Sequence, residues 1–182
     1  YEHTGENGLI EEARELVRFL IDKQTEYGAW YYTEPPEESH LTHDNYHTGY
    51  VLDALLQYIL ASGDERWLPN YEKGLGFYAD NLFLDDGTPK FLYDRLYPID
   101  IHGAAQGIIS FTRATSLFPD FREQAERVAD WAGRNMQADD GHFFYQRLRF
   151  FTKRFSLMRW AQAWMCFALS TLLATEDAPI DR

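Results

Sequence analysis

The segment Asp85-Asp86-Gly87-Thr88-Pro89-Lys90-Phe91 recurs in altered form as Asp139-Asp140-Gly141-His142-Phe143-Phe144-Tyr145. Each copy follows an amphipathic segment, and a third Gly turn, at Gly28, follows another. The three turn glycines are spaced 59 and 54 residues apart, which indicates a repeating unit of about 55 residues. We therefore expect one domain over residues 1–182, built from three repeats at about 9–63, 66–118 and 121–175.

Each repeat contains two helical segments of different character. The first segments, expected over 9–24, 71–84 and 121–136, carry one apolar stripe at helical spacing. The second segments, expected over 47–62, 101–117 and 157–175, are apolar nearly all round, and such a helix has to be covered on every side. The contrast predicts an all-α fold in which inner helices are enclosed by outer ones, with short extended segments in the turns. An ordinary six-helix array is the alternative.

The composition excludes several classes of protein. The net charge of −12 argues against a nucleic-acid or anionic-membrane surface, since both require a basic patch. A single cysteine, Cys166, excludes an internal disulfide framework and a cysteine-rich metal site. No stretch is long and apolar enough for a membrane span, and no signal peptide is visible. We expect a cytoplasmic location, although the chain starts at Tyr1 rather than Met and its N-terminus therefore looks incomplete.

Polar side chains gather where the first inner helix is expected to begin, in the stretch His43-Asp44-Asn45-Tyr46-His47. In a layered α/α array these helix starts converge on one face. Asp44 or Asn45 is suited to capping the helix, and His43 and His47 share one face if the helix has already begun. We interpret Asp44 and His47 as candidate catalytic residues, and His43, Asn45 and Tyr46 as candidate substrate contacts. Capping and packing are the structural alternative, and a metal site would need a third ligand.

The other two inner helices carry related groups. Asp100 is suited to capping the second helix, and His102 lies two residues further on. We interpret Asp100 and His102 as catalytic candidates, with core packing as the alternative. Four further side chains are candidate substrate contacts: Gln106, Arg159, Trp160 and Gln162.

The residue types allow two kinds of sugar chemistry. Glycoside hydrolysis usually needs two carboxylates, for which Asp44 and Asp100 are the candidates. Elimination or epimerisation at a uronic acid needs a base, an acid and a group that neutralises the carboxylate. The only basic run, Arg147–Arg154, binds an anionic group or forms a solvated face. Nucleophile-elbow, phosphate-loop, dinucleotide and metal signatures are missing from the sequence, so we expect no cofactor and no metal.

The stretches 43–52, 77–83, 86–90 and 97–106 resemble a bacterial family encoded among surface-polysaccharide biosynthesis genes, for capsule or lipopolysaccharide. That family is similar to the α/α-toroid proteins of the six-hairpin glycosidase type. The resemblance covers most of residues 10–175 but carries over no catalytic residue. It implies a toroid of twelve helices, whereas this sequence predicts six. The chain is therefore expected to form a half-ring, a fragment, or a part completed by another chain.

Together these observations predict a carbohydrate-active domain that acts on or binds a sugar or oligosaccharide in bacterial surface-polysaccharide metabolism. A glycosidase-, lyase- or epimerase-like enzyme is favoured. The main alternative is a non-catalytic helical-repeat scaffold, and a terpenoid cyclase is a weaker one. A half-ring would expose apolar edges of its inner helices, which favours self-association.

Overall fold

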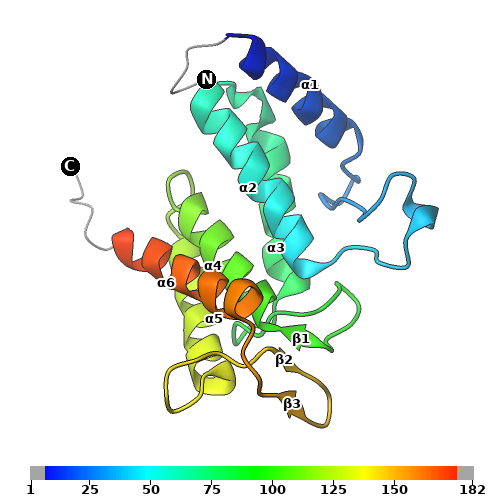
Figure 1. Cartoon of the computed structure of the whole chain (residues 1–182). Helices are drawn as coiled ribbons and strands as arrows, with labels where there is room; N and C mark the ends of the chain where they lie inside the picture. Colours follow the sequence, from blue (N-terminus) through cyan, green and yellow to red (C-terminus); the bar gives the residue numbers. More distant parts are fainter. Residues whose placement is uncertain (1–6, 176–182) are drawn as a thin grey trace.

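The structure, a computed structural model, describes residues 7–175. Within that range the chain forms six α-helices and three two-residue strands (Figure 1). The helices are α1 Asn7–Asp22, α2 Asn45–Ser62, α3 Leu68–Leu82, α4 Ile101–Ala114, α5 Phe121–Met136 and α6 Ala163–Ala174. The strands are β1 Ile99–Asp100, β2 Gln146–Arg147 and β3 Thr152–Lys153. None of the helices within residues 7–175 combines the length and the apolar character that a bilayer crossing requires.

Helix α4 is the centre of the fold. It packs against α2 on one side and α6 on the other, and α5 covers it from outside (Figure 1). Every residue of α4 except Arg113 is buried. An apolar helix is thus covered on all sides, as its sequence predicts. The arrangement is an all-α, partial toroid in which α2, α4 and α6 form the inner layer.

Helix α6 differs from that prediction, because one side of it is bare. Its sequence is apolar all round, yet only Met165, Ala168 and Leu172 are buried. Phe167 and Leu173 are 45% and 59% exposed. The expected enclosure is therefore incomplete at α6, which packs mainly on α4, and its exposed side is the bare inner-helix edge that a half-ring predicts.

The third inner segment also begins differently from the expected helix over 157–175. Met158–Gln162 forms a π-helical turn before α6. The backbone N–H groups of Ala161 and Gln162 both donate to the carbonyl oxygen of Leu157, so the first turn is wider than an α-turn.

The three Gly turns have a left-handed backbone conformation at the glycine. Gly28, Gly87 and Gly141 have φ values of 98°, 86° and 92°, in the left-handed region that glycine adopts without strain. At Gly87 a Cβ atom would also lie 2.5 Å from the carbonyl oxygen of Arg127, so a side chain is excluded there on steric grounds as well.

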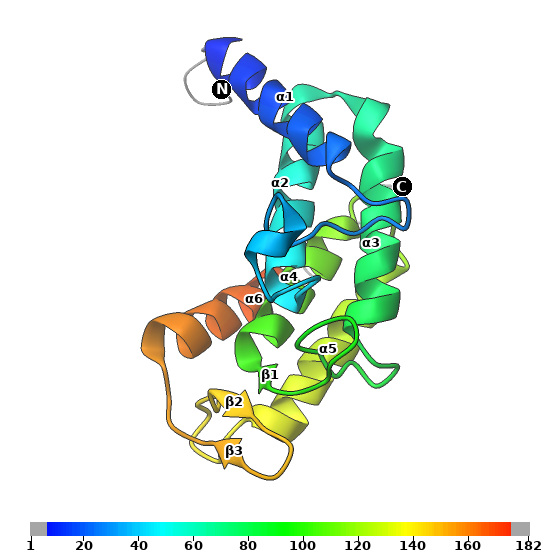
Figure 2. The same cartoon turned by 90° about the vertical axis from the view of Figure 1, so that its right-hand side faces the viewer.

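A small antiparallel sheet, which the sequence patterns do not predict, joins the second and third repeats in the order β1-β2-β3. Its register places Asp100 opposite Gln146, and Gln146 opposite Lys153. Figure 2 shows β1 leading directly into α4, with β2 and β3 beside it. The sheet therefore brings residues of the basic run to the start of the central helix.

Candidate functional site

The first turn of α2 holds a histidine–carboxylate pair. Asp44 caps the helix, and its Oδ2 accepts hydrogen bonds from the backbone N–H of His47 at 3.3 Å and from His47 Nδ1 at 2.7 Å. With its proton on Nδ1, the His47 ring keeps an unprotonated Nε2, which forms no hydrogen bond with the described part of the chain. The side chain of Asp44 is buried and that of His47 is 37% exposed. This is the geometry of a base oriented by a carboxylate.

His43 lies apart from this pair. Because α2 begins at Asn45, His43 precedes the helix, and the helical face that it would share with His47 does not form. Its Nδ1 lies 2.8 Å from the carbonyl oxygen of Trp30, and its Nε2 lies 3.0 Å from the hydroxyl of Tyr27. The ring is buried, so in this structure it anchors the loop around residues 27–30.

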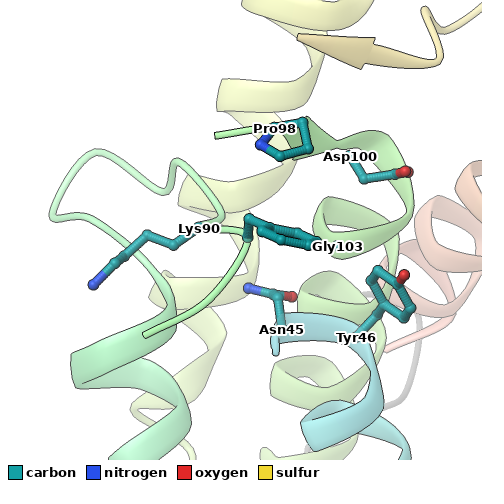
Figure 3. Close-up of a pocket in the computed structure, with 7 residues that line it drawn as sticks. Asn45, Tyr46, Lys90, Pro98, Asp100 and Gly103 are labelled. Carbon is teal, nitrogen blue, oxygen red and sulfur yellow. The ribbon is translucent and has the colours of Figure 1, made fainter. Parts of the chain in front are cut away.

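A small hollow of about 10 Å³, with room for about one water molecule, lies between the first turns of α2 and α4 (Figure 3). The amide of Asn45 donates to the carbonyl oxygen of Leu82 at 2.8 Å and accepts from the hydroxyl of Tyr78 at 3.2 Å, so its polar atoms hold α2 to α3. The hydroxyl of Tyr46, by contrast, has no hydrogen-bond partner within residues 7–175. The hollow is lined by Asn45, Tyr46, Lys90, Phe91, Pro98, Asp100 and Gly103.

Asp100 caps α4 and joins it to the π-helical turn. Its Oδ1 accepts from the backbone N–H of His102 and from the indole N–H of Trp160, both at 3.0 Å. Burial raises the pKa of Asp100 above its usual value, and these donors and the nearby Lys153 partly oppose that shift.

The side chain of His102 is fully buried, and its hydrogen bonds are those of an uncharged imidazole. Its Nδ1 donates to the carbonyl oxygen of Trp160 at 3.1 Å, and its Nε2 accepts from the hydroxyl of Tyr50. The ring stacks on the indole of Trp160 with centroids 4.1 Å apart and an interplanar angle of 16°. Burial lowers the pKa of His102, because the charged imidazolium is poorly solvated there. His102 is therefore enclosed by protein groups, with Tyr50 and Trp160 as its hydrogen-bonding partners.

Tyr50 is a site residue that the sequence analysis did not single out. It lies one turn after Tyr46 and contacts the rings of both His47 and His102. Burial, reinforced by the charges of Asp44 and Asp100, raises the pKa of Tyr50 to about 12. The same causes raise the pKa of Tyr46 further. Both phenols remain protonated at neutral pH and can donate hydrogen bonds. The i, i+4 spacing of two tyrosines was the available signal.

Gln106 lies apart from the residues around His47, Asp100 and His102. Its Nε2 donates to Asp53 Oδ2 at 3.1 Å and to Ser110 Oγ at 2.9 Å, one turn deeper between α2 and α4. Arg113 donates to the same Asp53 oxygen at 2.9 Å. Burial raises the pKa of Asp53, and Arg113 is the largest opposing influence. This network joins the two inner helices.

Gln162 and Arg159 are also separate from the hollow. Gln162 accepts from the backbone N–H of Phe143 at 2.9 Å and donates to its carbonyl oxygen at 2.7 Å, which fixes the third turn against the start of α6. Arg159 is exposed in the π-helical turn. Of the eleven predicted site residues, the structure gathers Asp44, Asn45, Tyr46, His47, Asp100, His102 and Trp160 at the starts of the inner helices.

A second hollow, of about 100 Å³, is lined by both members of the histidine–carboxylate pair. Three aromatic residues of the first turn form part of its wall, and the ring of Tyr32 contacts that of His47 with centroids 4.8 Å apart. The pair therefore lines this second hollow, whereas Asn45 and Tyr46 line the first. The lining residues are Trp30, Tyr31, Tyr32, Asp44, His47, Thr48 and Val51.

Comparison with solved structures identifies the fold. The chain is similar to cellobiose 2-epimerase from Bacillus thermoamylovorans B4167 (TM-score 0.71, 11% identity, 96% of this chain and 52% of that chain). It is similar to cellobiose 2-epimerase from Spirochaeta thermophila DSM 6192 (TM-score 0.72, 15% identity, 96% and 49%). An unsaturated glucuronyl hydrolase specific for heparin also matches (TM-score 0.64, 16% identity, 80% and 44%). No protein-family model and no curated protein matches the sequence.

These similarities establish the class of fold. These structures are α/α toroids, and the described helices form part of such a toroid. The chain spans about half the length of the structures it matches. At identities of 11–16% the similarity extends to the fold alone.

Proposed function

We propose that this chain is a carbohydrate-processing domain whose site lies at the starts of α2 and α4. The observation that carries the proposal is the Asp44–His47 pair, with its 2.7 Å hydrogen bond and an unoccupied Nε2, in the wall of a hollow that Trp30, Tyr31 and Tyr32 also line. Aromatic faces suit the apolar faces of sugar rings, and a carboxylate-oriented imidazole suits proton transfer at neutral pH. The solved structures with this fold are named as sugar-processing enzymes, which supports the proposal.

The geometry favours proton transfer at a sugar carbon over hydrolysis by two carboxylates. The carboxylate of Asp44 already accepts two hydrogen bonds from the protein and that of Asp100 three, in each case including one from the backbone of its own helix. In the proposed reaction, His47 Nε2 removes a proton next to a carbonyl group, and Asp44 stabilises the imidazolium that forms. The hydroxyl of Tyr46, a neutral donor with a raised pKa, stabilises the developing negative oxygen.

Hydrogen exchange tests this reaction class. Cellobiose and mannose are incubated with the protein in D₂O, and deuterium at C2 is followed by NMR. We expect catalysed incorporation that His47→Gln reduces by at least about 100-fold, the usual scale of general-base catalysis. His40→Gln, which removes an exposed imidazole elsewhere, is the matched control and should retain the rate. Equal exchange by wild type and His47→Gln would refute the role of His47.

The bare side of α6 supports a second proposal, self-association. A second copy of this chain would contribute three further hairpins, the number needed to complete a six-hairpin toroid. The exposed apolar side chains on and just before α6 would then be covered, which removes apolar surface from water. A non-catalytic scaffold would use the same surface, so sugar turnover separates the two functions.

The proposal extends to the biological setting. We propose that the domain works in the bacterial cytoplasm in surface-polysaccharide metabolism, on the strength of the sequence resemblance. Deletion of its gene tests this setting, and we expect loss of the surface glycan. Coexpression of the gene with those of a polysaccharide cluster is a second test.

A further inference from the structure

A row of three polar side chains crosses the small sheet beside the candidate site. Asp100, Gln146 and Lys153 lie directly opposite one another in β1, β2 and β3. Because directly opposed residues share one face of a sheet, the three side chains point the same way. The amide of Gln146 lies 3.5 Å from Asp100 Oδ2, and Lys153 Nζ donates to Gln146 Oε1 at 2.9 Å.

Lys153 is a cation whose charge is not neutralised by contact with a carboxylate. Within residues 7–175 its ammonium group contacts the amide oxygen of Gln146 rather than a carboxylate, and it lies 5.5 Å from the ring centroid of Tyr145. One of its three N–H groups is used by Gln146, which leaves two for another acceptor. It is linked to the site through Gln146, whose amide lies 3.5 Å from Asp100 Oδ2. Gln146 thus holds a half-buried ammonium group at the edge of the candidate site.

Two other basic residues near the site, Arg147 and Lys90, do not point toward Asp100 as Lys153 does. Arg147 follows Gln146 on β2, so its side chain lies on the opposite face of the sheet, where it donates to Asn135 of α5 at 3.4 Å. Lys90 lines the first hollow, but Figure 3 shows its side chain pointing away from Asp100, and it donates to the carbonyl oxygen of Tyr93. Lys153 is therefore the basic side chain that this sheet directs to the Asp100 side.

We propose that Lys153, positioned by Gln146, binds the carboxylate of a uronic-acid residue in the sugar substrate. A single ammonium group with two available donors matches a singly charged, two-oxygen acceptor. The inference deepens the proposed function, on which it rests, by assigning the substrate to the acidic sugars. Lys153 is a specificity residue in this scheme, and the proton-transfer group remains His47.

Calorimetric titration with two disaccharides of equal size tests the assignment. The probes are cellobiose, which is neutral, and glucuronosyl-glucose, which carries one carboxylate. We expect wild type to bind the acidic disaccharide about tenfold more tightly, the scale of one charge-assisted hydrogen bond. Lys153→Gln should lose this preference and keep its affinity for cellobiose. Arg147→Gln removes an equal charge from the opposite face and should keep the preference.

The outcomes separate the two proposals. Retention of the tenfold preference by Lys153→Gln, or equal affinities in wild type, would overturn the carboxylate subsite and leave the sugar site intact. Loss of the preference in both variants would assign it to overall charge and would also overturn the subsite. Failure of wild type to bind either disaccharide would refute the proposed function itself. Unchanged cellobiose affinity in Lys153→Gln verifies that the variant is folded.

Discussion

Gly49→Ala tests the packing that places the two site helices side by side. Gly49 lies at the closest approach of α2 to α4, where an added Cβ would be 2.4 Å from Gln106 Cγ and 2.9 Å from the hydroxyl oxygen of Tyr78. Both contacts are shorter than real Cβ contacts, so Gln106 has to move. Gln106 is held by Asp53 and Ser110, and its movement breaks those hydrogen bonds.

Three contributions determine how much Gly49→Ala changes the free energy of unfolding. Overpacking costs about 1–3 kcal/mol, and leaving the buried polar partners unsatisfied costs about 1–3 kcal/mol. The higher helix propensity of alanine returns about 1 kcal/mol. We therefore expect Gly49→Ala to lower the free energy of unfolding by about 3 kcal/mol. For a chain of this size that corresponds to a fall in Tm of about 6–12 °C.

Thermal and urea unfolding, followed by circular dichroism, measure the effect. Gly76→Ala in α3 is the matched control, because nothing lies within 4 Å of its added Cβ. It should stabilise the protein by about 0.5–1 kcal/mol. Removal of the Gln106 side chain should relieve most of the conflict, so Gly49→Ala should cost much less in a Gln106→Ala background. A neutral or stabilising Gly49→Ala, or the same cost in both backgrounds, would refute the described contact between α2 and α4.

Three further predictions concern ionisation, capping and association. Burial lowers the pKa of His102 below 6.5, so below that pH the unfolded chain binds a proton more readily than the folded chain, and the free energy of unfolding falls. In urea unfolding at pH 7.5 and 5.5, His102→Gln should therefore lose less stability than wild type between the two pH values. An equal loss would count against a neutral His102. Asp100→Ala should cost about 1–2 kcal/mol in the same assay through loss of the α4 cap, whereas no change would show that the cap is dispensable. Phe167→Glu should shift sedimentation velocity from dimer to monomer, and a monomeric wild type would contradict self-association.

The repeats and caps were accessible from sequence because they are local signals. The turn glycines, the first-turn aspartates Asp44 and Asp100, and the apolar character of α4 all lie within a few residues of the feature that they determine. The boundaries of α5 agree with the expected segment 121–136 for the same reason.

Sequence patterns do not place residues whose position depends on distant parts of the chain. His43 failed to pair with His47 because the helix starts at Asn45, and Tyr27 and Trp30 hold the ring instead. Gln106 donates its hydrogen bond to Asp53, a residue 53 positions away on another helix. The Asp100–Gln146–Lys153 row depends on strand register, for which two-residue strands leave no periodic pattern.

The indole N–H region of a ¹⁵N–¹H spectrum, recorded with and without a disaccharide, tests the central claim most directly. The chain has five tryptophans, which lie at different distances from the proposed site. Trp160 donates to Asp100 beside the first hollow, and Trp30 lines the second, whereas Trp131 lies on the outer helix α5. A bound sugar should shift the signals of Trp160 and Trp30 and leave that of Trp131 unchanged. Saturating sugar that moves neither Trp160 nor Trp30 would contradict a carbohydrate site at the starts of α2 and α4.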